Sequence, residues 1–431
     1  MLRERSGLAR IPVLSFGFRP FFLGGAVWAV VAMALWIGEL SGAWLVTGSY
    51  GGLAWHVHSL LFGYVPAVVA GFLLTAVPNW TGRLPVRGGP LLALFLLWVA
   101  GRVALLGADR IGLPAAVTID SAFLVVLALV ILREIVAGRN WRNLKTVVLV
   151  SALAAANIAF HAEVLATGSP GTALRAGTAV IVGLIMLIGG RITPSFTRNW
   201  LARREAAALP APSGRFDVAA LAVAGVALFA WVAAPESVAT GIALLAAAVL
   251  QAIRLGRWAG IATWREPLVL VLHLGYLFVP LGFALVAVSI LWPDAIPPAV
   301  VVGTGEGTAE DWRAAGKGVA DIATRAATRS VALVPPDDAL HAWTVGAVAM
   351  MTLAVMTRAT LGHTGRDLVA GLPTQAIYAA ILVAVAARLA VPLAPAATMG
   401  LLTLAGAGWI AGFAGFALVF GPMLLSPRLT A

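Results

Sequence analysis

Residues 267–292 read PLVLVLHLGYLFVPLGFALVAVSILW, a run of 26 residues without a charged side chain. As an α-helix this run would extend about 39 Å, which is enough to cross a hydrocarbon core of about 30 Å. In such a core every backbone N–H and C=O group must bond within the protein, and a helix meets that requirement. We therefore predict a transmembrane helix here, with His273 inside it.

Comparable apolar runs recur along all 431 residues, and together they predict an all-α, polytopic transmembrane bundle of about 12 spans. We treat residues 1–431 as a single membrane domain. The predicted spans are 21–40, 55–77, 90–107, 114–137, 146–166, 172–192, 216–234, 237–256, 267–292, 339–361, 368–390 and 396–424.

The composition supports a lipid environment and excludes several kinds of protein. Hydrophobic residues make up 61% of the chain and charged residues 11%, whereas a soluble domain carries about 25% charged residues. The absence of cysteine excludes disulfides, thiolate-bound metals and covalently attached haem. The formal charge of +11 does not indicate nucleic-acid binding, because the arginines are scattered between apolar runs.

Basic residues near span ends predict the orientation, since cytoplasmic loops are enriched in Lys and Arg. With 12 spans both termini lie on one side. Of the 29 basic residues, 21 fall in the termini and the alternate connections that share that side, and 8 fall in the others. We therefore predict that both termini are cytoplasmic.

One connection, residues 293–338, is too long and too polar to be a simple turn. We predict that it is a periplasmic loop between the ninth and tenth spans. Thr308 and Asp311 could form a capping box, and apolar residues follow at helical spacing, which favours a short amphipathic helix on the membrane surface. The alternative is a disordered insertion rich in Gly and Ala.

Histidines are the residues best suited to bind a metal without cysteine. A single His in a bundle is more often a helix-packing group than a ligand, but position narrows the choice. Four lie near the outer ends of spans and two nearer the inner side. The outer ones are His56, His58, His161 and His341, and the inner ones are His273 and His363.

We predict two separate groups of ligands. His58 and His341 are expected at an outer site, and His273 and His363 toward the inner side. His341 and His363 are 22 residues apart, about 33 Å of helix, so they cannot share a metal in a continuous helix.

His56 and His58 should point to opposite faces of their helix, because they are about 200° apart around its axis. His58 shares its predicted face with Phe62, Val65, Val69 and Phe72, an apolar wall of the kind a porphyrin packs against. His58 is therefore the better haem candidate, and His56 the better candidate for copper or for helix packing.

Acidic residues are scarce inside the spans, and Asp120 is the single deep carboxylate, expected to be paired or protonated. An ion-coupled transporter needs a chain of ionisable groups at mid-depth, so this scarcity counts against one. Met350, Met351 and Met356 could ligate a soft metal, but methionine in an apolar helix is usually a packing residue.

Several motifs in this chain resemble those of the NnrS family of bacterial membrane proteins. They extend from about residue 10 to residue 367, with two departures. Ser59 stands where the family's WHxHE pattern has Glu, and the long loop at residues 293–338 has no expected counterpart in the family. The motifs are Gly17-Phe-Arg-Pro-Phe-Phe22, Trp55-His-Val-His58, Gly71 to Gly82, Gly189-Gly-Arg-Ile-Thr-Pro-Ser-Phe-Thr197, Pro267 to Tyr276, and His341 to Arg366.

The resemblance implies a protein of the bacterial inner membrane that contains non-covalent b-type haem and copper and takes part in denitrification and the nitric-oxide response. Nitric oxide or metal-nitrosyl species would be its ligands, and respiratory or denitrification proteins its candidate partners. The family's motif histidines correspond to His56, His58, His273, His341 and His363, while the catalytic residues stay unknown. We expect binding, sensing or detoxification, without deciding whether it is an enzyme.

Two alternatives come from other functional classes. One is a transporter of copper, haem or another small solute, which would need a polar pathway at mid-depth. The other is a non-catalytic assembly partner of a respiratory complex, which would purify with that complex and hold no cofactor.

The predicted orientation is testable with reporter fusions along the chain. Fusions after Thr47 and within residues 300–335 should report a periplasmic position, and fusions after Arg139 or Arg204 a cytoplasmic one. A single inverted pair would contradict the arrangement of 12 spans.

Overall fold

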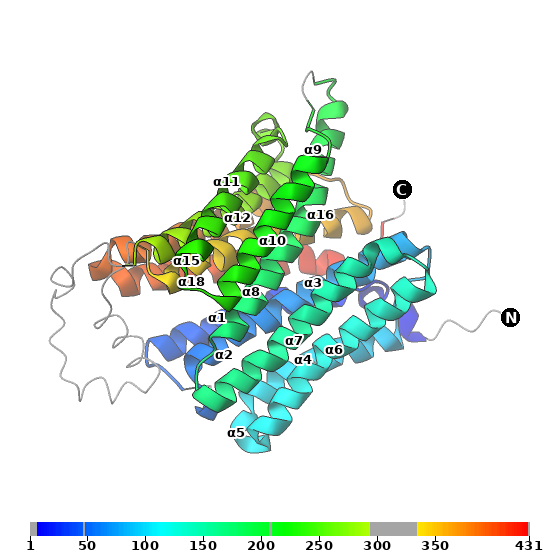
Figure 1. The fold of residues 1–431 in the computed structure, drawn as a ribbon. Helices are drawn as coiled ribbons and strands as arrows, with labels where there is room; N and C mark the ends of the chain where they lie inside the picture. Colours follow the sequence, from blue (N-terminus) through cyan, green and yellow to red (C-terminus); the bar gives the residue numbers. More distant parts are fainter. Residues whose placement is uncertain (1–6, 46–47, 207–208, 294–333, 430–431) are drawn as a thin grey trace, which may run out of the picture.

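The computed structural model describes residues 7–45, 48–206, 209–293 and 334–429, and these residues form helices and connections without a β-strand. Within this part of the chain, 12 helices are long and apolar enough to cross a membrane (Figure 1). The predicted all-α transmembrane bundle is thus confirmed. The orientation stays a prediction.

The spans match those expected from the sequence, with ends shifted by a few residues. In chain order they are α1 (Phe18–Leu40), α2–η4–α3 (Gly52–Thr81), α4 (Gly89–Leu106), α6 (Leu113–Ala137), η5–α7 (Trp141–Thr167), α8–η6–α9 (Thr172–Ala202), α10 (Arg215–Ala233), α11 (Val238–Gly256), α12 (Pro267–Leu291), α15–η9–α16 (Pro336–His363), α17–η10 (Leu372–Leu393) and η11–α18 (Pro395–Leu425).

The largest difference from prediction is in the sixth span, which was expected to end at residue 192 and continues through Pro194 to Ala202. Proline lacks the N–H that would bond the carbonyl of Gly190, four residues earlier. The guanidinium of Arg254 on α11 donates to that carbonyl at 3.5 Å. A neighbouring helix therefore satisfies the freed group, which is how membrane helices tolerate proline.

The long connection between the ninth and tenth spans falls on residues 294–333, outside the described residues. The surface helix predicted to begin near Thr308 is among them, so it stays a prediction.

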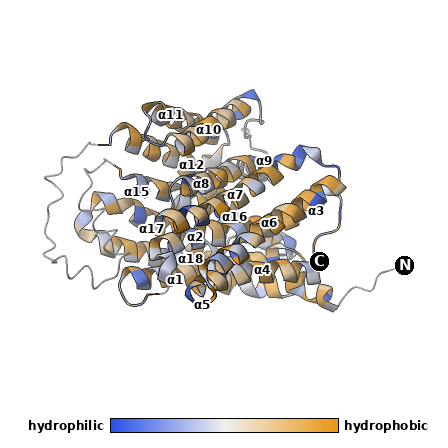
Figure 2. Ribbon diagram, turned by 60° about the horizontal axis from the view of Figure 1, so that its bottom comes forward, coloured by the Kyte–Doolittle hydropathy of each residue, from blue (hydrophilic) through white to orange (hydrophobic). Residues whose placement is uncertain are grey.

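The second and tenth spans are the most buried helices of the bundle. Around them, α1 packs on α3 and α18, α6 packs on α4 and α7, and α11 packs on α10 and α12. Colouring by hydropathy shows apolar residues along the helices (Figure 2). Val103, Phe229 and Leu418 have exposed fractions of 61%, 75% and 76%, as expected of side chains that face lipid.

Three spans contain a π-helical segment, in which the backbone is wider than an α-helix. The segments are η4 (Ser59–Tyr64), η6 (Ile185–Gly189) and η9 (Ala342–Ala349). Such segments leave backbone carbonyls short of partners and often mark functional sites.

Side chains from neighbouring helices bond to the carbonyls of η4. Trp28 on α1 donates its Nε1–H to Ser59 O at 2.9 Å, and Trp98 on α4 donates to Gly63 O at the same distance. Arg102 on α4 also donates to a carbonyl of this segment. These bonds hold the end of α2, and therefore His58, in a fixed position.

The contact between α17 and α18 depends on a small residue, as is usual between membrane helices. A Cβ atom added at Gly408 would lie 2.7 Å from the carbonyl oxygen of Ala380, and backbone cannot move aside easily. A Cβ at Gly400, also on α18, would meet no atom within 4 Å.

We expect Gly408→Ala to lower the thermal unfolding midpoint in detergent, because overpacking destabilises by about 1–3 kcal/mol. Gly400→Ala is the matched control and should leave the midpoint unchanged or slightly higher, since Ala favours helix more than Gly does. Equal midpoints for the two variants would contradict this account of the α17–α18 contact.

Candidate functional site

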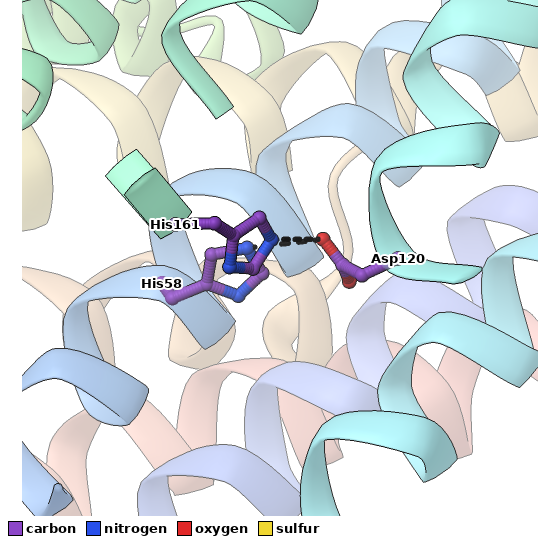
Figure 3. Close-up of side chains that lie close together, drawn as sticks. All are labelled: His58, Asp120 and His161. Carbon is purple, nitrogen blue, oxygen red and sulfur yellow. Dashed lines mark hydrogen bonds and ion pairs between the residues drawn. The ribbon is translucent and has the colours of Figure 1, made fainter. Parts of the chain in front are cut away.

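Two buried histidines from different spans meet at the carboxylate of Asp120, which lies on a third span (Figure 3). Asp120 lies on α6, His58 at the end of α2 and His161 on α7. The Nε2 atoms of His58 and His161 lie 3.1 and 3.0 Å from Asp120 Oδ2. One carboxylate oxygen therefore accepts from two imidazoles.

The negative charge of Asp120 is balanced by Arg102 on α4. Its guanidinium forms an ion pair with Asp120 Oδ1 and donates to the carbonyl of Phe62 at 3.1 Å. The side-chain amide of Asn157 donates to Oδ2 at 3.1 Å. Asp120, which was predicted to be paired or protonated, is thus paired with a cation, and Arg102 also ties this cluster to the π-helical segment η4.

The hydrogen bonds of His161 determine its tautomer and occupy both of its ring nitrogens. Because Nε2–H donates to Asp120, Nδ1 carries the lone pair and accepts from the hydroxyl of Tyr50 at 2.7 Å. His161 therefore has no free nitrogen for a metal.

His58 differs from His161 because one of its ring nitrogens stays free. Its Nε2 lies 2.8 Å from the side-chain oxygen of Asn157 as well as 3.1 Å from Asp120, so Nε2–H is the donor. Its Nδ1 is buried and finds no hydrogen-bond partner among the described residues. A His that donates one N–H to a carboxylate and presents the other nitrogen has the arrangement typical of metal ligands.

His58, Asp120 and His161 can also be regarded as a three-ligand metal site, because one ligand atom from each lies within 4.8 Å of the others. We favour a different interpretation. A cation among them would lie beside the guanidinium of Arg102 and would displace the bonds that orient both imidazoles. The cluster is better suited to hold His58 so that its Nδ1 faces a ligand.

The other two outer histidines lie near each other, apart from the Asp120 cluster. The ring of His56 stacks on Trp36, with 4.4 Å between centroids, and its Nδ1 is buried without a partner in the described structure. Nδ1 of His341 donates to the carbonyl of Asp337 at 2.7 Å, which leaves Nε2 as the available nitrogen. His341 interacts electrostatically with both His56 and Arg388.

His273 on α12, toward the side predicted to be the inner one, has the same kind of free nitrogen. The hydroxyl of Thr197 donates to the carbonyl of Thr193 at 2.9 Å, so it accepts from Nε2–H of His273 at 2.8 Å. The Nδ1 of His273 is buried and unpartnered within the described residues. It faces Gly260, where no larger residue would fit against the ring.

His363 is exposed, and its ring packs on Phe18 at 5.3 Å. No hydrogen bond or ring contact joins it to His273 in the described part of the chain. The structure therefore does not bring these two together, nor His58 with His341. It pairs His58 with His161, whose ring centroids are 4.5 Å apart, and it places His341 within electrostatic range of His56.

Sequence reasoning singled out His58, His161 and Asp120 separately but missed the residues that link them, namely Tyr50, Asn157 and Arg102. Asn157 precedes His161 by four residues in an apolar helix, so the two share a face. That spacing was a usable signal. Met350, Met351 and Met356 are buried in the core, as expected for packing residues.

Comparison with known proteins gives one assignment. The model of the family described as NnrS protein matches residues 12–428, which is nearly the whole chain. None of the curated proteins matches this sequence.

The ion pair at Asp120 yields a stability prediction. Arg102→Leu should destabilise the protein by about 3–5 kcal/mol, because it leaves a buried carboxylate without its cation. Thermal unfolding in detergent measures the change, and Arg110→Leu at an exposed position of α5 (Ala108–Ile111) should leave the midpoint unchanged. An equal, small effect of both substitutions would show that Arg102 does not balance Asp120.

Proposed function

This chain belongs to the NnrS family, and on that premise we propose that it is a haem- and copper-containing protein of the bacterial inner membrane that binds nitric oxide, for sensing or detoxification. The observation that carries the proposal is the buried Nδ1 of His58, which has no partner among the described residues and is oriented through Nε2 by a charged carboxylate. Such a nitrogen in an apolar bundle needs a ligand to be satisfied.

The donor set fits haem and copper. Neutral imidazole is a ligand for both metals, and the lack of cysteine is compatible with non-covalent haem. His341 offers Nε2 with its ring fixed by the bond from Nδ1 to Asp337 O, while His56, His58 and His273 offer Nδ1 atoms that have no partner among the described residues. These four residues would hold the metals, with His363 as a further candidate on the inner side. When bound, ferrous haem or Cu(I) would supply an electron-rich position that binds nitric oxide.

The protein's own part is to fix the ligands and exclude water. Asp120 and Asn157 keep His58 in the Nε2–H tautomer, so that Nδ1 is always available. Arg102 keeps Asp120 ionised and therefore a strong acceptor. Phe62 and Phe160 pack on the ring of His58, both at 5.6 Å between centroids, and shield it from solvent.

The proposal is tested by measuring haem and copper per protein and by recording absorption spectra of the dithionite-reduced protein with and without nitric oxide. His58→Ala and His341→Ala should each lose bound metal while the fold persists, because each removes a coordination bond and leaves only a small cavity. Asp120→Asn should weaken metal binding by about 10–100-fold, as changes next to a ligand usually do.

His161→Gln serves as the graded control, since His161 orients the cluster without a free nitrogen. It should lower metal affinity without abolishing binding. If His58→Ala and His341→Ala both keep full haem and copper in folded protein, these histidines are packing groups and the proposal fails.

A further inference from the structure

An apolar groove lies in the middle of the bundle, between the second, sixth and tenth spans. Its cavity volume is about 90 Å³, far below the range of about 300–1,000 Å³ for pockets that bind drug-sized ligands, so it suits only very small molecules. Val69, Ile188 and Met351 line it from the three spans, and each lies near the midpoint of its own span. The groove is thus placed at the depth of the hydrocarbon core, where its occupant has to come from the bilayer.

The three π-helical segments belong to the three spans that form the groove. Ile185, Ile188 and Gly189 of η6 and Val348 of η9 line it directly, and Val65 lines it immediately after η4. Because π-helical segments are rare and concentrate at functional sites, their convergence on one groove is an independent indication of function.

A chain of contacts leads from the groove to His58. Val65 and Ile181 line the end of the groove nearest η4. One turn further along the same two helices, the ring of Phe62 packs against Gly177, where an added Cβ would clash with it. The ring of Phe62 then contacts the ring of His58, with 5.6 Å between centroids. Phe62 therefore separates the groove from His58.

We propose that this groove admits nitric oxide from the bilayer to His58, with the side chain of Phe62 as the gate. The inference rests on the proposed function and adds to it the direction from which the ligand arrives.

The lining decides which molecules can use this route. Of the lining residues only Thr352 carries a polar side chain, and its hydroxyl is already bonded to Tyr64 at 2.7 Å and to the carbonyl of Val348 at 2.6 Å. An ion or a polar solute would lose its hydration here without gaining hydrogen bonds. A small, uncharged, lipid-soluble gas has no such hydration to lose.

Xenon, an apolar atom that binds in dry cavities, tests the groove independently of any metal. Crystals or lipid-reconstituted protein under xenon pressure should show xenon between Val69 and Ile188. Val69→Phe should fill the groove and remove that site, whereas Val226→Phe, on the lipid-exposed face of α10, should leave it unchanged. A groove that takes up no xenon in the parent protein, or is filled by an acyl chain, overturns the proposal.

The rate of nitric oxide association with the reduced, metal-loaded protein tests the route. Val69→Phe should slow association several-fold and Phe62→Ala should accelerate it, with Phe62→Leu as the milder variant should the first fail to fold. If nitric oxide binds and Val69→Phe leaves the rate unchanged, the route is wrong while the proposed function stands. If nitric oxide does not bind the parent protein, the proposed function fails and the route with it.

Discussion

A carboxylate buried among apolar helices must be neutralised and fully hydrogen-bonded, and the region around Asp120 is organised by that constraint. Arg102 supplies the charge, while His58, His161 and Asn157 supply donors, so five side chains from four spans are tied together. Because the site is buried, losing any one of these bonds would destabilise the fold, since water cannot replace the lost partner. The same bonds that satisfy Asp120 determine which nitrogen of each histidine is free. One set of hydrogen bonds therefore balances the charge of Asp120 and orients His58 as a candidate metal ligand.

A second buried arginine in the bundle bonds to a carboxylate and to a carbonyl of a π-helical segment, as Arg102 does. Arg254 on α11 donates to Asp217 on α10 at 3.0 Å and to the carbonyl of Met186, in η6, at 3.2 Å. Arg102 does the same with Asp120 and the carbonyl of Phe62, in η4. A planar guanidinium can serve a carboxylate and a carbonyl at once because it presents several fixed donors. In each case a buried ion pair supports a π-helical segment, so the wide turns that flank the groove are held by charge as well as by packing.

The histidines show how burial separates ligand candidates from structural groups. All but His363 are wholly or partly buried, yet His161 uses both nitrogens within the protein, whereas His58 and His273 use only Nε2. Proximity alone would group His58 with Asp120 and His161 around a cation. The donor and acceptor roles of the ring nitrogens favour a different assignment, in which His58 is the metal ligand and Asp120 and His161 belong to the cluster that orients it. Membership of the NnrS family does not choose among these nitrogens.

The sequence alone determined the fold class and the number of spans, because the length and apolarity of each segment follow directly from the thickness of the hydrocarbon core. It also identified Asp120 as the single deep carboxylate, expected to be paired or protonated. Only the tertiary structure decided which residues each histidine contacts. His58 meets His161 rather than His341, because both imidazoles reach Asp120 on α6, and such contacts join residues far apart in the chain. The π-helical segments η4 and η6 were equally hidden, because the side chains that bond to their carbonyls, Arg102 and Arg254, come from other spans.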